Sequence, residues 1–182
     1  MMPGEKMNNM TQIRRAGRDE IRQVSTFLDD CWKTAYRGII SDEYLDSLPI
    51  KERNKGRLQR FDEGGTDFLM MFDGYELIGA AVFGKSFTEG YEEDGEVSAI
   101  YLREEYIGKG YGHELYMSIE QALAAKGFNN YVLDVLKDNV RAIQFYRAHG
   151  FEIVDDRSIL LSDTNYPLVV MRKVNEVRNA EN

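Results

Sequence analysis

The spacing of hydrophobic residues predicts helices in the first third of this chain. Residues 11–17 alternate as a short strand does, and apolar residues then recur three or four positions apart over residues 19–36. Asp19 is a suitable N-cap for this amphipathic helix. A second short helix is expected over residues 41–48, and one or two further helical turns over residues 51–65, which end at two glycines.

After residue 65 the spacing of apolar residues changes to that typical of strands. Residues 67–72 and 75–87 are apolar runs separated by Asp73-Gly74, which is a strong hairpin signal. An acidic loop follows, and residues 95–103 return to strand character. The rest of the chain predicts alternating helices and strands: helices to residue 125 and over 140–149, and strands over 130–136, 151–156 and 166–174.

The order of these elements indicates an α+β (mixed α/β) fold, with hairpins first and two strand-helix-strand crossovers afterwards. No repeat or low-complexity linker divides the chain. We therefore expect one domain over residues 11–174, a flexible leader over 1–10 and a flexible tail over 175–182.

Composition narrows the classes of function. The 182 residues carry a net charge of -8, which is the wrong sign for binding nucleic acid or an anionic membrane. Cys31 is the single cysteine and only two histidines occur, so we expect neither a disulfide nor a metal site. The sequence has no signal-peptide pattern and no apolar run of membrane-spanning length, which favours a cytoplasmic protein.

Two motifs suggest chemistry. In the first, IGKGYG at residues 107–112, glycines allow the backbone to approach a ligand, and the following helix presents free N–H groups to a phosphate. A purely structural turn would have the same pattern. The position of the motif after several strands argues against a dinucleotide fingerprint, and the absence of GKS or GKT excludes a P-loop.

The second motif, NVRAIQFYRAHGF at residues 139–151, places Tyr146 in a helix that ends at Gly150 before a strand. Together the two motifs resemble the GNAT superfamily of N-acetyltransferases. The family's phosphate loop has the form Gln/Arg-x-x-Gly-x-Gly/Ala, and this chain departs from it at Ile107. The second family pattern is matched without gaps by Asn139, Ala142, Phe145, Tyr146, Gly150 and Phe151.

The resemblance implies a GNAT-like curved mixed sheet, split centrally to hold acyl-CoA and flanked by helices on both faces. It further implies that acetyl-CoA is the co-substrate and that strands 96–103 and 130–136 border the split. The positions implied to hold acetyl-CoA are Ile100, Tyr101 and Leu102 for the pantetheine arm, Ile107, Gly108, Lys109, Gly110, Tyr111, Gly112 and His113 for the pyrophosphate, and Asn139, Ala142 and Phe145 on the second motif.

Acetyl transfer needs an acid for the leaving thiolate and a neutral attacking amine. By resemblance Tyr146 is the acid, although a core aromatic residue is the alternative, and Glu96 matches the position of a glutamate base. A solvated residue at a strand edge is an equal alternative for Glu96. Asp134, inside an apolar strand, is the weaker candidate for the base.

The acceptor side is less defined. Trp32 and Tyr36 are candidate acceptor-binding residues, with Tyr44 and the acidic run Glu89, Glu92, Glu93 and Asp94 near them, and core packing is the alternative. We predict an N-acetyltransferase acting on a primary amine of a small molecule or peptide, with a homodimer possible through strand 166–174. A non-catalytic acyl-CoA sensor and a nucleotide-binding domain remain alternatives.

Overall fold

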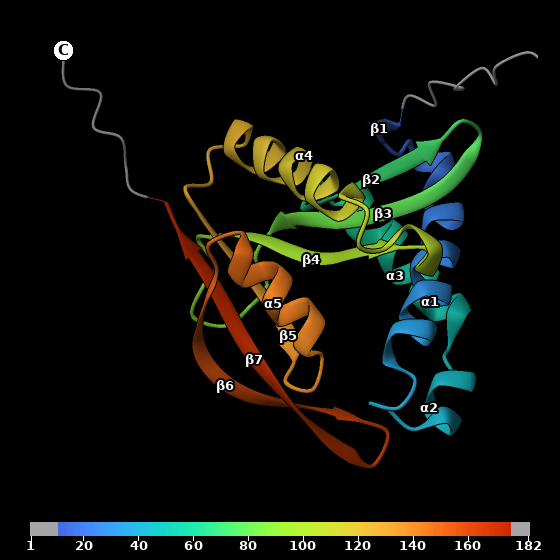
Figure 1. Ribbon diagram of the computed structural model, residues 1–182, viewed down its shortest axis with the longest axis vertical. Coiled ribbons are helices and arrows are strands. Elements are labelled where there is room, and N and C mark those ends of the chain that lie inside the picture. The colour runs from blue at the N-terminus through green and yellow to red at the C-terminus, as the bar shows by residue number, and fades with distance from the viewer. Residues whose placement is uncertain (1–10, 176–182) are drawn as a thin grey trace, which may run out of the picture.

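The computed structural model describes residues 11–175, and the predicted leader and most of the predicted tail lie outside them. Seven strands form one sheet in the order β1-β2-β3-β4-β5-β7-β6 (Figure 1). The predicted mixed α+β fold is confirmed. The strands are β1 (Gln12–Arg15), β2 (Thr66–Asp73), β3 (Glu76–Lys85), β4 (Gly95–Leu102), β5 (Asn130–Leu136), β6 (Glu152–Leu161) and β7 (Thr164–Val174).

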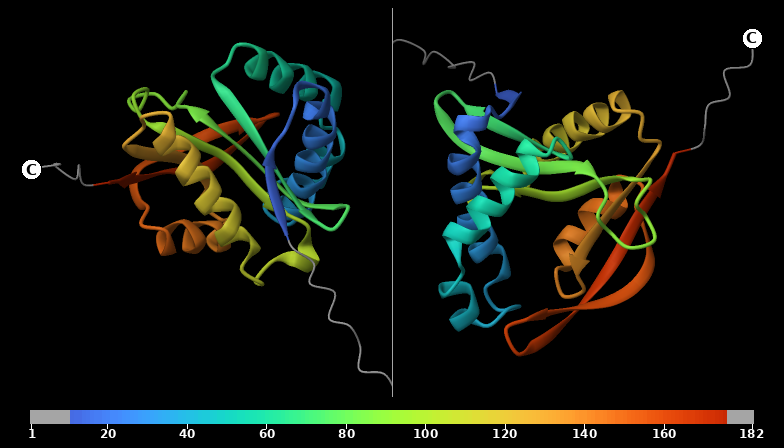
Figure 2. Two further views of the ribbon diagram at one scale, coloured as in Figure 1. Left: turned by 90° about the horizontal axis from the view of Figure 1, so that it is seen from above. Right: turned by 180° about the vertical axis from the view of Figure 1, so that it is seen from behind.

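Helices cover both faces of the sheet, as Figure 2 shows. On one face lie α1 (Ile21–Tyr36), α2 (Asp42–Asp46) and α3 (Ile50–Asp62), and on the other α4 (Tyr111–Ala125) and α5 (Val140–Ala148). Because successive side chains of a strand point to opposite faces of the sheet, β2 contributes to a hydrophobic core on each face. Phe68 and Met70 pack with α1, while Leu69 and Met71 pack with α4. This two-sided burial explains the continuous apolar runs of β2 and β3.

The sheet is split at its centre. β4 and β5 are parallel but pair only at Gly95 with Tyr131 and Glu96 with Val132, and the two strands then diverge (Figure 1). All other neighbouring strands pair antiparallel. Because β4 continues to Leu102 without a partner on its β5 side, its backbone is available to a ligand along that edge.

Local signals set several element ends. Ser41 caps α2 by accepting a hydrogen bond from the Tyr44 amide, and Asp73-Gly74 makes the predicted β2–β3 turn, with Gly74 at a φ of +60°. The prediction of Asp19 as the N-cap of α1 was wrong. Asp19 lies in a short 3₁₀ turn over Arg18–Glu20, and Glu20 is the N-cap.

The last hairpin was predicted incompletely. β6 was expected to end at residue 156 and β7 to begin at residue 166, but they run to Leu161 and from Thr164. The missed end of β6 is mostly exposed, and its apolar residues Ile159, Leu160 and Leu161 are consecutive, so they show no alternation to reveal a strand. β7 lies between β5 and β6, so it is not the sheet edge proposed for dimer pairing; β6 holds that position. No helix among residues 11–175 is long and apolar enough to cross a membrane.

Candidate active site

A cavity of about 320 Å³ lies where β4 and β5 separate. Its walls come from α1, α2 and α3, from the diverging strands, from α5 and from the β6–β7 hairpin. The tip of that hairpin meets α2, where the Ser41 amide donates to the Tyr166 hydroxyl at 3.2 Å. The cavity is lined by Trp32, Tyr36, Tyr44, Arg53, Val97, Ser98, Ala99, Ile100, Tyr101, Asp134, Val135, Leu136, Asn139, Ala142, Tyr146, Ile159, Leu161 and Leu168.

The glycine-rich segment has the backbone that a phosphate loop requires. Gly108 and Gly110 have φ values of +78° and +95°, a region that residues with a Cβ avoid. Gly110 is the N-cap of α4 and supplies no side-chain acceptor, so the first amides of the helix remain free. Gly112 packs closely instead, because a Cβ there would lie 3.3 Å from the ring of Phe145. This arrangement fits a pyrophosphate.

The three non-glycine residues of this segment make local contacts. The Ile107 amide donates to the Glu104 carbonyl at 3.1 Å, and Lys109 places its ammonium 5.7 Å from the centre of the Tyr106 ring. Tyr111 packs edge-on against the same ring, with the two ring centres 5.6 Å apart. These local contacts support the turn. The anion cradle itself is made of backbone groups, so the absence of glutamine or arginine at Ile107 leaves it intact.

The open edge of β4 carries the three residues predicted to meet the pantetheine arm. Ile100, Tyr101 and Leu102 pair with β3 on one side and face the split on the other. The Leu102 carbonyl is additionally held by the Cys31 thiol, which donates to it at 3.6 Å. Ile100 and Tyr101 line the cavity, so the structure brings this predicted strand edge to the site.

Helix α5 presents its first residues and Tyr146 to the same cavity. Asn139 is the N-cap, with its side-chain oxygen accepting from the Ala142 amide at 3.2 Å, which leaves its NH₂ group for a ligand. Tyr146 is 8% exposed, and burial raises the pKa of its hydroxyl above the ordinary value, so it is protonated at neutral pH. Phe145 points elsewhere and packs edge-on against Tyr116 of α4.

Glu96 does not reach this cavity. Its carboxylate accepts hydrogen bonds from the Phe87 amide at 2.8 Å and from the hydroxyls of Ser86, Thr88 and Ser98. The three donors from Ser86, Phe87 and Thr88 share Oε2 and tie the start of β4 to the loop before it, while Ser98 of β4 donates to Oε1. The geometry favours a structural role over the role of base predicted from sequence, because one oxygen is fully used by the loop.

Asp134 instead lies on the cavity wall, on the β5 side of the split. The residue is exposed, yet partial burial of its carboxyl raises the pKa of this group. The nearby carboxylate of Glu96 raises that pKa further, and Arg157 opposes the shift. A carboxylate with a raised pKa at this place is suited to accept a proton from an amine.

The predicted acceptor-binding aromatics form the wall opposite β5. The rings of Trp32 and Tyr36 lie 4.9 Å apart, and Tyr44 meets Trp32 edge-on at 6.3 Å. Burial, and then the neighbouring Tyr36, raise the pKa of Tyr101 well above its ordinary value. Trp32 and Tyr36 belong at once to the cavity wall and to a small apolar cluster with Leu136 and Leu168. Core packing therefore applies to both residues, and acceptor binding by them stays a prediction.

The acidic loop does not form the mouth of this cavity. Asp94 is 4% exposed and forms a two-pronged ion pair with Arg172 of β7 at 2.6 and 3.0 Å. Glu92 accepts a hydrogen bond from the Gly90 amide, and neither it nor Asp94 lines the cavity. The carboxylates of Glu92 and Asp94 thus hold the loop in place, one by a bond within the loop and the other by the ion pair with β7.

Two groups of functional candidates were missed by the sequence. Arg53 of α3 lines the cavity, although it lies in a strongly polar segment without a motif. Ile159, Leu161 and Leu168 of the β6–β7 hairpin close the other side. Nothing in their sequence spacing marks them, since they reach the site through strand pairing with distant residues.

The fold and this site define a CoA-dependent acyltransferase architecture, and comparison with known proteins agrees. Residues 26–151 match the Acetyltransferase (GNAT) family, and the chain belongs to this family. It is an N-acetyltransferase. An uncharacterized N-acetyltransferase of Bacillus subtilis, YuaI, is 34% identical over 147 residues, which are 80% of this chain and 82% of that protein.

Two further similarities come from Thermoplasma acidophilum. A spermidine N(1)-acetyltransferase is 24% identical over 162 residues, or 85% of this chain and 97% of the relative. The crystal structure of a PaiA N-acetyltransferase in complex with coenzyme A is similar with a TM-score of 0.72 and 25% identity, covering 90% of this chain and 98% of that one. The predicted family and fold are therefore confirmed.

Proposed function

We propose that this protein transfers the acetyl group of acetyl-CoA to a primary amine of a small molecule or peptide by direct attack. The observation that carries the proposal is the arrangement of three features along the split between β4 and β5. The glycine cradle at the start of α4 lies beside Leu102 at the end of β4, the edge of β4 is unpaired, and the buried hydroxyl of Tyr146 belongs to the cavity. The coenzyme A complex of the similar PaiA enzyme supports the first two as the co-substrate site.

In the proposed reaction the neutral amine attacks the thioester carbonyl carbon, a C–N bond forms and the C–S bond breaks. The leaving thiolate takes the proton of the Tyr146 hydroxyl. Since a phenol with a raised pKa is fully protonated at neutral pH, the group is in the form that can donate. Asp134 is the proposed acceptor of the amine proton, directly or through water, and the base role first predicted for Glu96 passes to it.

The name of the spermidine relative supports a small-molecule amine as the acceptor. An ammonium group would also be attracted by the net charge of -8. Spermidine, free amino acids, aminoglycosides and peptide amino termini are therefore the first compounds to compare.

The proposal is tested by calorimetric titration with acetyl-CoA and CoA, with ATP and NAD as controls, followed by release of CoA thiol across the amine panel. Binding of the CoA compounds alone and thiol release with at least one amine are expected. Binding without release for any amine would contradict the transferase reaction, and ATP or NAD binding that acetyl-CoA cannot displace would contradict the assignment of the cradle.

A further inference from the structure

We infer that the amine acceptor also carries a carboxylate, as an amino acid or short peptide does, and that Arg53 recognises this anionic group. The inference rests on the proposed acetyltransferase function and specifies the substrate class of the same cavity. It follows from an unbalanced positive charge on the helical wall, opposite a negative charge on the strand wall.

Arg53 is fixed at the cavity by two contacts. Its Nε donates to Asp29 Oδ1 at 2.8 Å, and its guanidinium carbon lies 5.3 Å from the centre of the Trp32 ring. Among residues 11–175 no acceptor is hydrogen-bonded to either terminal nitrogen of Arg53. The side chain is 28% exposed, so its free donors are accessible from the cavity that it lines.

The charge around Arg53 is not balanced by its own ion pair. Asp29 is 1% exposed and its Oδ1 accepts from both Arg53 and Arg57, each at 2.8 Å. One carboxylate therefore serves two guanidinium groups, which leaves one positive charge in excess. Arg57 also donates to the Ser25 carbonyl and lies outside the cavity lining, so Arg53 is the member of the triad that faces a ligand.

The opposite wall carries a carboxylate, and the nearby cation Arg157 is paired with Asp155 and lies outside the cavity lining. Asp134 lies on β5 across the split from Ser98 and Ala99 of β4, and all three line the same cavity as Arg53. An acceptor with an ammonium group near Asp134 and a carboxylate near Arg53 would satisfy both walls. A polyamine carries only positive groups, so Arg53 would repel any part of it that extended toward α3.

The planar fork of a guanidinium matches a carboxylate, with two parallel N–H donors for its two oxygens. Stacking on Trp32 and the bond to Asp29 hold this fork in one orientation, which reduces the entropy lost on binding. The aromatic wall of Trp32, Tyr36 and Tyr44 then borders the intervening part of the acceptor.

The test compares acceptors that differ only in the carboxylate: amino acids and their carboxamides, with spermidine as a cationic reference. At neutral pH a carboxamide has more of its amine in the reactive neutral form, so without recognition it would be the better acceptor. For the wild-type protein we expect kcat/KM to be at least about tenfold higher for the acid than for its amide, which is the size of a charged hydrogen-bond contribution.

Arg53→Gln and Arg57→Gln are matched variants, because each removes one guanidinium from Asp29 and leaves the other. We expect Arg53→Gln to lower kcat/KM for the acid by about tenfold or more and to leave the amide within about twofold. Arg57→Gln should keep the ratio of acid to amide. In the wild-type protein a simple short-chain carboxylate should inhibit competitively against the acceptor, which tests the site even where a variant folds poorly.

Equal use of acid and amide, a preference for spermidine, or an equal effect of Arg53→Gln on both acceptors would overturn the inference while the acetyltransferase function stands. Failure of every amine to release CoA thiol would instead reject the proposed function and this inference with it. The two failures are therefore distinguishable in the same set of assays.

Discussion

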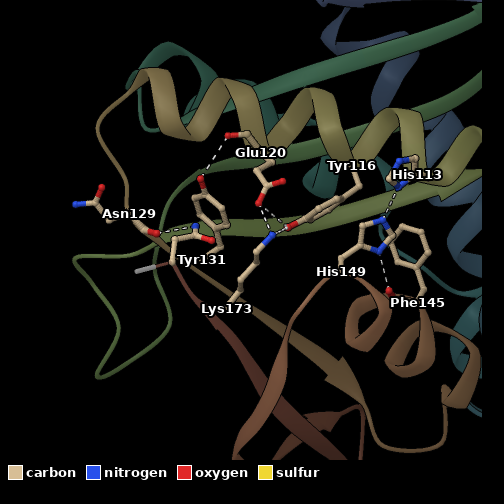
Figure 3. Close-up of polar contacts among 9 residues, drawn as sticks. His113, Tyr116, Glu120, Asn129, Tyr131, Phe145, His149 and Lys173 are labelled. Carbon is tan, nitrogen blue, oxygen red and sulfur yellow. Dashed lines mark hydrogen bonds and ion pairs between the residues drawn. The ribbon is translucent and has the colours of Figure 1, made fainter. Parts of the chain in front are cut away.

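The imidazole of His113, in the first turn of α4, lies 2.9 Å from the imidazole of His149 at the end of α5 (Figure 3). His149 Nδ1 is also 2.8 Å from the Phe145 carbonyl, which can only accept, so His149 donates there. This leaves His149 Nε2 as the acceptor for a hydrogen bond from Nδ1 of His113. The pair thus joins the helix of the phosphate cradle to the helix that carries Asn139 and Tyr146.

His113→Ala tests whether His113 acts through its backbone or its side chain. Because its imidazole is used by His149, we expect the affinity for CoA to stay within about threefold and the free energy of unfolding to fall by about 1 kcal/mol, the size of one net hydrogen bond. Calorimetry and thermal denaturation measure the two effects. A loss of affinity beyond tenfold without loss of stability would indicate that the imidazole binds the ligand.

Gly110→Ala should weaken CoA binding. The substitution forces a Cβ into a φ of +95°, at a cost of about 1 kcal/mol or more, and shifts the amides that begin α4. Gly56→Ala is the matched control in the middle of α3, where a Cβ would meet no atom within 4 Å. We expect it to raise stability by about 0.5–1 kcal/mol and leave CoA binding unchanged. Equal CoA affinity of the two variants would contradict the requirement for a positive φ angle at Gly110.

Tyr146→Phe removes the proposed acid with little change of shape. We expect kcat to fall by at least about tenfold, as for loss of a positioned proton donor, with the affinity for acetyl-CoA nearly constant. Since burial raises the pKa of Tyr146, the wild-type rate should show no loss from its ionisation at least up to about pH 10, the ordinary phenol value. A variant of normal kcat would exclude Tyr146 as the acid.

Asp134→Asn and Glu96→Gln separate the two candidate bases. If Asp134 takes the amine proton, its replacement lowers kcat and removes the acidic limb of the pH profile. Glu96→Gln should mainly lower stability, because the carboxylate accepts from three donors of the preceding loop and from Ser98 of β4. A larger kcat loss in Glu96→Gln would return the base role to Glu96.

The raised pKa of Asp134 also predicts the sign of a stability effect. A carboxyl whose pKa is raised on folding binds protons more tightly in the folded state, so its ionisation destabilises the fold as pH rises. Asp134→Asn should therefore increase the melting temperature at neutral pH and have no such advantage well below pH 4, where the aspartate is protonated in both states. Thermal denaturation at the two pH values measures this difference.

Cys31 should react slowly with thiol reagents. Burial raises the pKa of its thiol to about 11, and the thiol donates to the Leu102 carbonyl. At pH 7 the thiolate fraction is then roughly two orders of magnitude below that of a free cysteine, and alkylation by iodoacetamide should be slower in proportion. The denatured protein provides the reference rate, and modification of the native protein at that rate would contradict the assignment.

Short stretches of the sequence determined many of the turns, helix caps and strands of this protein. Positive φ angles require glycine at positions 108 and 110, and Asn139 caps α5 by accepting a hydrogen bond from the amide of Ala142, three residues later. Each motif therefore depends on only a few adjacent residues. The hairpin at Asp73-Gly74 and the apolar periods of the strands are local in the same sense. For this reason the family, the fold and the turns of the glycine-rich segment could be predicted before any coordinates.

The tertiary structure decided which charges meet at the cavity. Glu96 belongs to one of the two residue pairs that join β4 to β5, beside the loop that binds its carboxylate. Asp134 lies two residues beyond these pairs on β5, where the strands diverge, and its carboxylate is left at the cavity. Arg53 reaches the same cavity because Asp29, on another helix, holds two arginines. Such relationships depend on how strands and helices far apart in sequence pack, and no local period or cap encodes them.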